Sequence, residues 1–180
     1  MLLKMRDKNG AYTAKECAFL AVFVAVVIVA QLAFSAVPGV ELVTVLFAAY
    51  SFSAGWKRGM LSATAFSLLR ILIFGFFPTV LILYLIYYNL LAFTFGALGG
   101  RIKNTIKSLP FLVIVACLGT ALFSVLDNII TPIWYGYSAQ ATRAYFFASL
   151  PFMIPQVICV AISVSVLFLP LWKVFKTLYK

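Results

Sequence analysis

The chain contains no histidine and only four acidic residues among its 180 amino acids. Histidine is the commonest general acid–base residue and the commonest metal ligand, so its absence removes most hydrolytic and metal-dependent chemistry. The acids Asp7, Glu16, Glu41 and Asp127 do not pair at a catalytic spacing, and the sequence contains no P-loop for ATP. We therefore predict that the protein is not an enzyme and has no metal or other cofactor.

Cysteine is also scarce. Cys17, Cys117 and Cys159 lie in or beside apolar segments, and no two of them have CxxC spacing. This pattern indicates small buried side chains, and it argues against a disulfide set or a metal site.

Charged residues make up 10% of the chain and hydrophobic residues 65%, whereas soluble domains carry about 25% charged residues. A helix that spans a membrane needs about 20 apolar residues, and six such stretches fill the sequence. The first stretch lacks a cleavage pattern and is followed by more spans, so we expect it to be retained. We predict one all-α integral membrane domain with six transmembrane helices, over residues 14–37, 41–55, 60–77, 79–100, 109–127 and 151–172.

Every lysine and arginine except Arg70 and Arg143 falls before or at the very start of the first predicted helix, after the sixth, or in the connections 56–59 and 101–107. With six spans all these segments lie on one side, which the positive-inside rule makes cytoplasmic. Both termini are then cytoplasmic, and the net charge of +10 is a topology signal and not a nucleic-acid footprint. The expected location is the plasma membrane of a prokaryote, in contact with lipid.

Arg70 lies inside a predicted span, where insertion costs at least about 2.5–3.5 kcal/mol. It could contact an anionic or carbonyl group of a ligand, or it could pair with Glu41 or Asp127. Tyr84, Tyr88 and Asn89 lie midway along the fourth predicted helix, where a buried amide needs partners. They could line a cavity or belong to an interfacial aromatic belt.

Gln156 lies near the outer end of the last predicted helix. It is the one residue of this helix that we expect to contact a ligand. The connection 128–150 follows Asp127 and Asn128 and carries Trp134 and Tyr135. It could form a lid over an outward-facing cavity or an anchor at the membrane interface, and residues 138–149 could form a short surface helix.

Two sets of small residues predict close helix packing. Gly96 and Gly100 form a GxxxG pair, interpreted as internal. The first helix carries an alanine stripe: Ala14, Ala18, Ala21 and Ala25.

Three segments resemble the substrate-binding (S) subunits of energy-coupling-factor (ECF) importers, which are basic six-helix membrane proteins of this size. The segments are residues 38–47 with 55–59, residues 145–152, and residues 169–171. The resemblance implies high-affinity binding of a vitamin or related micronutrient, with cobalamin weakly preferred over flavin, pyridine, pteridine or queuosine-type compounds. It also implies partners: a transmembrane coupling subunit, against which the alanine stripe would dock, and two ATPase subunits.

The resemblance further implies that the ligand lies in the outer half of the protein, between the last three helices. The candidate ligand-binding residues are Glu41, Arg70, Tyr84, Tyr88, Asn89, Asp127, Asn128, Trp134, Tyr135 and Gln156. The alternatives are a self-contained transporter or channel, an assembly protein without a ligand, and a membrane enzyme. The first would need a continuous polar path, but the inner halves of the predicted helices are nearly all apolar.

Overall fold

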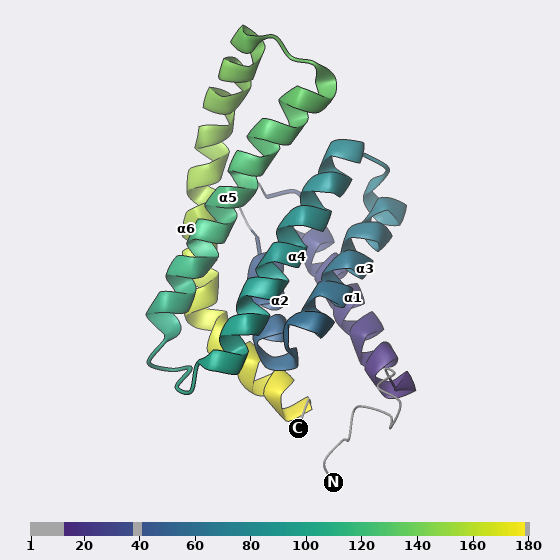
Figure 1. Ribbon diagram of the computed structural model, residues 1–180, viewed down its shortest axis with the longest axis vertical. Helices are drawn as coiled ribbons and strands as arrows, with labels where there is room; N and C mark the ends of the chain where they lie inside the picture. Colours follow the sequence, from purple (N-terminus) through teal and green to yellow (C-terminus); the bar gives the residue numbers. More distant parts are fainter. Residues whose placement is uncertain (1–12, 38–40, 179–180) are drawn as a thin grey trace.

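The computed structural model describes residues 13–37 and 41–178, and within them the protein consists of six helices (Figure 1). The N-terminal cations up to Lys8 and the segment 38–40 lie outside the described residues. The helices are α1 (Ala14–Phe34), α2 (Val43–Ala54), α3 (Trp56–Phe74), α4 (Pro78–Arg101), α5 (Leu109–Tyr135) and α6 (Ala139–Leu178).

Four of these helices, α1, α4, α5 and α6, are long and apolar enough to cross a membrane. Helix α2 is apolar, but its 12 residues extend only about 18 Å, less than the roughly 30 Å of a hydrocarbon core. Helix α3 has 19 residues and carries Lys57, Arg58 and Arg70. The architecture is consistent with an all-α membrane protein.

The connection between α2 and α3 is shorter than predicted. Gly55 has a φ of 88°, a conformation that only glycine adopts without strain, and α3 begins at the next residue. The expected turn over residues 56–59 is therefore wrong: these residues form the first turn of α3. Arg58 there donates to Glu16 of α1 at 2.5 Å, and the Glu16 side chain is only 3% exposed.

The predicted long connection over residues 128–150 is also wrong. Helix α5 continues through Pro132 to Tyr135, and α6 begins at Ala139. Gly136 ends α5 in the left-handed conformation with φ 63°, as glycine commonly does at helix ends. Ser138 then accepts from the amide of Ala141 at 3.2 Å and caps α6. Residues 138–149 form no separate surface helix, because they belong to the first turns of α6.

Proline does not interrupt the helices around the predicted connection. Pro132, Pro151 and Pro155 lie inside helices, although each removes one backbone hydrogen bond. Bundled membrane helices tolerate this loss because neighbouring groups satisfy the freed carbonyls. The result is a long α5–α6 hairpin, in which the 40 residues of α6 extend about 60 Å. This hairpin projects beyond the other helices at the upper end of Figure 1.

Helix α2 is the centre of the bundle, with ten of its 12 residues buried, and it packs against α3, α4 and α6. Helix α1 lies at the edge (Figure 1) and packs mainly along α3. Helix α1 begins, and α6 ends, at the lower end of the molecule, where the α2–α3 turn and the α4–α5 connection also lie (Figure 1). The cations of these segments therefore gather at the end opposite the α5–α6 tip.

Close packing of α4 depends on Gly96 and Gly99. A Cβ atom at Gly96 would overlap the Trp56 backbone, and one at Gly99 would overlap the carbonyl of Phe52. A Cβ at Gly100 would meet nothing. The predicted packing pair Gly96 and Gly100 is therefore wrong in its second member, because the α2–α3 corner meets α4 at a spacing of three residues.

Candidate ligand-binding site

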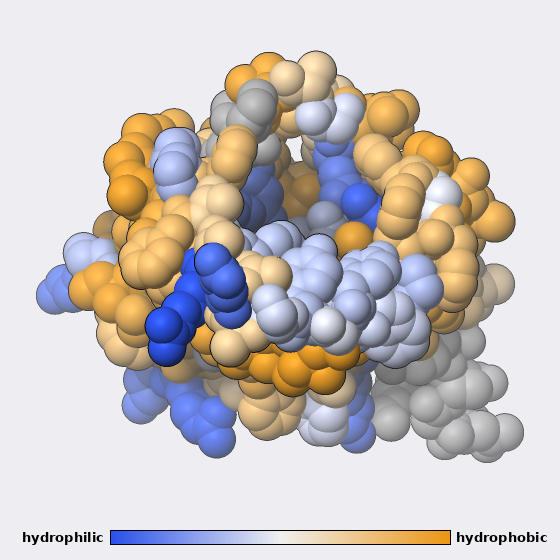
Figure 2. Space-filling view, turned by 90° about the horizontal axis from the view of Figure 1, so that it is seen from above, coloured by the Kyte–Doolittle hydropathy of each residue, from blue (hydrophilic) through white to orange (hydrophobic). Residues whose placement is uncertain are grey.

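A cavity of about 380 Å³ opens in the upper half of the bundle. Figure 2, seen from above, shows the molecule hollowed there, with hydrophilic side chains inside and mostly hydrophobic residues around them. Its walls come from the end of α1, the segment before α2, the end of α3 and the outer parts of α4, α5 and α6. Five of the ten predicted ligand-binding residues line it: Glu41, Arg70, Tyr84, Tyr88 and Gln156.

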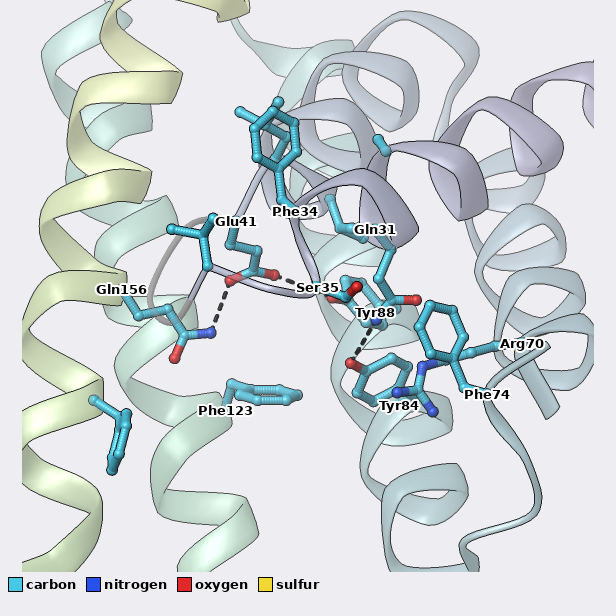
Figure 3. A pocket seen from close by; sticks show the side chains of 15 residues that line it. Gln31, Phe34, Ser35, Glu41, Arg70, Phe74, Tyr84, Tyr88, Phe123 and Gln156 are labelled. Carbon is cyan, nitrogen blue, oxygen red and sulfur yellow. Dashed lines mark hydrogen bonds between the residues drawn. The ribbon is translucent and has the colours of Figure 1, made fainter.

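Glu41 is the centre of a hydrogen-bond network that joins three elements (Figure 3). Its Oε1 accepts from Thr44 of α2 at 2.8 Å and from the Tyr88 hydroxyl of α4 at 3.1 Å, and its Oε2 accepts from Gln156 of α6 at 2.9 Å. Its backbone amide also donates to the sulfur of Cys159 at 3.4 Å. Glu41 stands just before α2, where the positive end of the helix dipole favours a carboxylate.

Arg70 lies on the other side of the cavity and forms no ion pair with Glu16, Glu41 or Asp127, the acids within the described residues. Its guanidinium carbon is 4.7 Å from the centre of the Phe74 ring and 4.5 Å from that of Tyr84. Such cation–π contacts stabilise a desolvated guanidinium. Its Nε is buried without a hydrogen-bond partner, and the expected alternative of an ion pair with Glu41 or Asp127 does not occur.

Gln31 of α1 completes the Arg70 side of the cavity. Its Nε2 donates to the Tyr84 hydroxyl at 2.9 Å, while its Oε1 is buried without a partner. The sequence analysis missed Gln31, although an isolated amide near the end of an apolar helix is a signal of its own. Ser35 and Phe123 also line the cavity and were missed; nothing in the local sequence distinguishes this phenylalanine from the chain's other 17.

Asn89 does not reach the cavity. Its Oδ1 accepts from Thr64 of α3 at 3.2 Å and its Nδ2 donates to the Leu85 carbonyl at 2.8 Å. The prediction that it lines the cavity is wrong, because Asn89 follows Tyr88 by one residue, about 100° around the helix. Its amide instead links α3 to α4.

Asp127 and Asn128 belong to the α5–α6 hairpin. Asp127 accepts from Thr131 and from the Tyr145 hydroxyl, each at 2.8 Å, and Asn128 donates to Ser149 at 2.8 Å. Asp127 lines a second cavity of about 350 Å³. The two cavities share the side chains of Phe123, Phe152 and Gln156 as walls.

Trp134 and Tyr135 lie in the last turn of α5, exposed by 53% and 54%. They line neither of the two cavities. The lid predicted for this segment does not form, because the residues are helical and project with the hairpin tip. The alternative of an interfacial anchor is compatible with their exposure.

The alanine stripe of α1 faces away from the bundle. Ala14, Ala18, Ala21 and Ala25 are all exposed, while the buried residues of α1 lie on another face of the helix: Glu16, Phe23, Val24, Val27 and Ile28. The stripe thus offers a smooth apolar face that none of the other five helices covers.

The cavity can hold a small molecule by three kinds of contact: a carboxylate, a guanidinium and flat aromatic faces. Comparisons with protein-family models, with curated proteins and with solved structures find no match to the chain.

Proposed function

We propose that this chain is the substrate-binding subunit of an ECF-type importer, which takes up a vitamin or related micronutrient. In this proposal all six helices are membrane-embedded, both termini are cytoplasmic, and the upper end of the bundle faces the outside of a prokaryotic cell. The cavity is the observation that carries the proposal. It gathers Glu41, Arg70, Gln31 and Gln156 in the half of the molecule opposite the basic end.

The charge distribution supports the orientation. Lys57, Arg58, Arg101, Lys103 and Lys107 lie in segments at the lower end of the bundle (Figure 1). Cations retained on one side mark that side as cytoplasmic. The cavity would then open to the medium from which a substrate is captured.

The alanine stripe supports a partner. Small residues let a second helix approach closely, and the stripe is exposed on the helix at the edge of the bundle. In the proposal this face docks on the transmembrane coupling subunit, which carries two ATPase subunits. Energy would then come from these partners, since the chain itself has no P-loop.

The size of the cavity bears on the substrate. A volume of about 380 Å³ equals roughly a dozen water molecules at about 30 Å³ each. A compound of one or two rings fits within this volume.

Mass spectrometry of small molecules released from gently purified protein tests ligand binding. We expect one compound to co-purify with the wild type and with Gln140→Ala, because Gln140 is an exposed residue of α6. We expect it to be depleted in Gln156→Ala, because Gln156 lines the cavity on the same helix. Equal recovery from all three proteins would contradict binding at this site.

Reconstitution in liposomes tests the division of labour. The chain alone should bind substrate but not accumulate it, and uptake should require the coupling subunit, the ATPases and ATP. Uptake by the chain alone would replace the proposal with a self-contained transporter.

A further inference from the structure

The two charged side chains of the cavity, Glu41 and Arg70, are each held by groups other than the opposite charge. Glu41 is held by three hydrogen-bond donors, and Arg70 by two aromatic rings. Opposite charges in a partly dry cavity attract strongly, yet these two form no ion pair. The cavity therefore has one acidic and one basic side, with space between them (Figure 3).

The acidic side retains capacity for one more donor. An ionised carboxylate offers about four acceptor positions. Oε1 accepts from Thr44 and Tyr88, whereas Oε2, among the residues that the structure describes, accepts from Gln156 alone. One N–H group of a ligand therefore fits on Oε2, and the three protein donors keep the carboxylate oriented for it.

The basic side carries one donor without an acceptor. The guanidinium carbon lies 4.7 Å from the centre of the Phe74 ring and 4.5 Å from that of Tyr84, so these rings fix where the guanidinium stands. Its Nε is buried without a partner, and leaving such a donor unsatisfied costs about 1–3 kcal/mol or more. A planar guanidinium with fixed orientation matches a carboxylate through two parallel hydrogen bonds.

Aromatic side chains separate the two sides. The Phe123 ring packs against Tyr84 with centroids 5.8 Å apart, and in Figure 3 it lies below Glu41, with Tyr84 between it and Arg70. Phe34 and Phe74 also line the cavity. Flat apolar faces of this kind suit a planar ring.

We propose that the ligand is a planar heterocycle of one or two rings that donates an N–H to Glu41 at one edge and presents a carboxylate to Arg70 at the other. This inference rests on the proposed function to the extent that the same cavity is the substrate site. It specifies a charge pattern that vitamin binding alone does not require.

Three matched probes test this pattern on the purified protein in lipid nanodiscs, by calorimetric titration. Pterin-6-carboxylate carries both groups, pterin lacks the carboxylate, and naphthalene-2-carboxylate lacks the N–H donors. We expect the first probe to bind about 10- to 100-fold more tightly than either of the others, as charge-assisted hydrogen bonds of this kind contribute.

The variant Arg70→Gln assigns the carboxylate contact. We expect the affinity difference between pterin-6-carboxylate and pterin to disappear in this variant, while the affinity for pterin stays within about twofold, since distant contacts are independent. If the variant does not fold, the ranking of the three probes on the wild-type protein decides alone.

Failure of this inference differs from failure of the proposed function. Equal affinities for the three probes, or a co-purifying compound without both groups, would overturn the inference and leave the importer subunit standing. No small molecule co-purifying and no probe binding would overturn both.

Discussion

The Glu41 network gives a quantitative test of how the upper half of the bundle is held together. In Glu41→Gln the side chain keeps its shape, but its three charge-assisted hydrogen bonds become neutral or lose an acceptor. Hydrogen bonds to charged groups contribute about 1.5–3 kcal/mol and neutral ones about 0.5–1.5 kcal/mol, so each bond weakens by roughly 1 kcal/mol. Glu41 is only partly buried, and water entering the cavity offsets part of this loss.

We therefore expect Glu41→Gln to destabilise the protein by about 2 kcal/mol, which lowers the Tm of a chain of this size by roughly 4–8 °C. Thermal unfolding of the purified protein in detergent, followed by tryptophan fluorescence, measures this shift. Gln156→Ala should lower Tm by a smaller amount, because it removes one of the three donors, and Gln140→Ala should leave Tm unchanged.

The double variant Glu41→Gln/Gln156→Ala decides whether the two residues interact as described. Residues joined by a hydrogen bond lose less together than the sum of their separate losses. Strictly additive shifts in Tm, or a Tm of Glu41→Gln equal to that of the wild type, would refute the network.

Other variants separate packing, docking and binding. Gly96→Ala should destabilise the protein by about 1–3 kcal/mol through overpacking, whereas Gly100→Ala should be neutral or slightly stabilising. Equal unfolding midpoints for the two variants would refute the close approach of α4 to Trp56. Asn89→Ala should lower the free energy of unfolding by about 0.6–1.5 kcal/mol, because it loses its interhelical hydrogen bond. It should leave the dissociation constant of the ligand unchanged. Weakened binding at unchanged Tm would instead mean that Asn89 contacts the ligand. Ala21→Leu should reduce uptake by the full complex and leave ligand binding by the isolated subunit intact. Ala141→Leu, at an exposed position of α6, is the control and should change neither. Loss of binding in Ala21→Leu would contradict the docking role of Ala21.

The structure brings together several residues that local signals selected as isolated polar groups in apolar surroundings. Glu41, Arg70 and Gln156 stand out because burying a charge or an amide is costly without partners, and all three line the cavity. The same argument selected Asn89, which is equally isolated but bonds to α3. Polarity thus indicates that a partner exists, whereas only the helix rotation decides which partner it is.

The helix boundaries predicted at residues 127 and 151 are wrong. Pro132 and Pro151 stand inside α5 and α6, and the true boundary is at Gly136 and Ser138, which are ordinary capping residues. The cross-hairpin bonds of Asp127 to Tyr145 and of Asn128 to Ser149 support the helices through this region. Those contacts join residues 18 and 21 positions apart, so a local reading of the chain does not contain them.

The amino-acid sequence by itself determined that the chain is helical and apolar, which residues are costly to bury, and at which end its cations gather, because composition and charge spacing depend on no tertiary contact. The tertiary structure alone decided that Glu41 receives donors from α2, α4 and α6 and that the rings of Phe74 and Tyr84 hold Arg70. It also decided that Gln31 lines the same cavity. These are contacts between residues up to 115 positions apart, and their formation depends on how α1, α3, α4 and α6 rotate and cross around the buried α2.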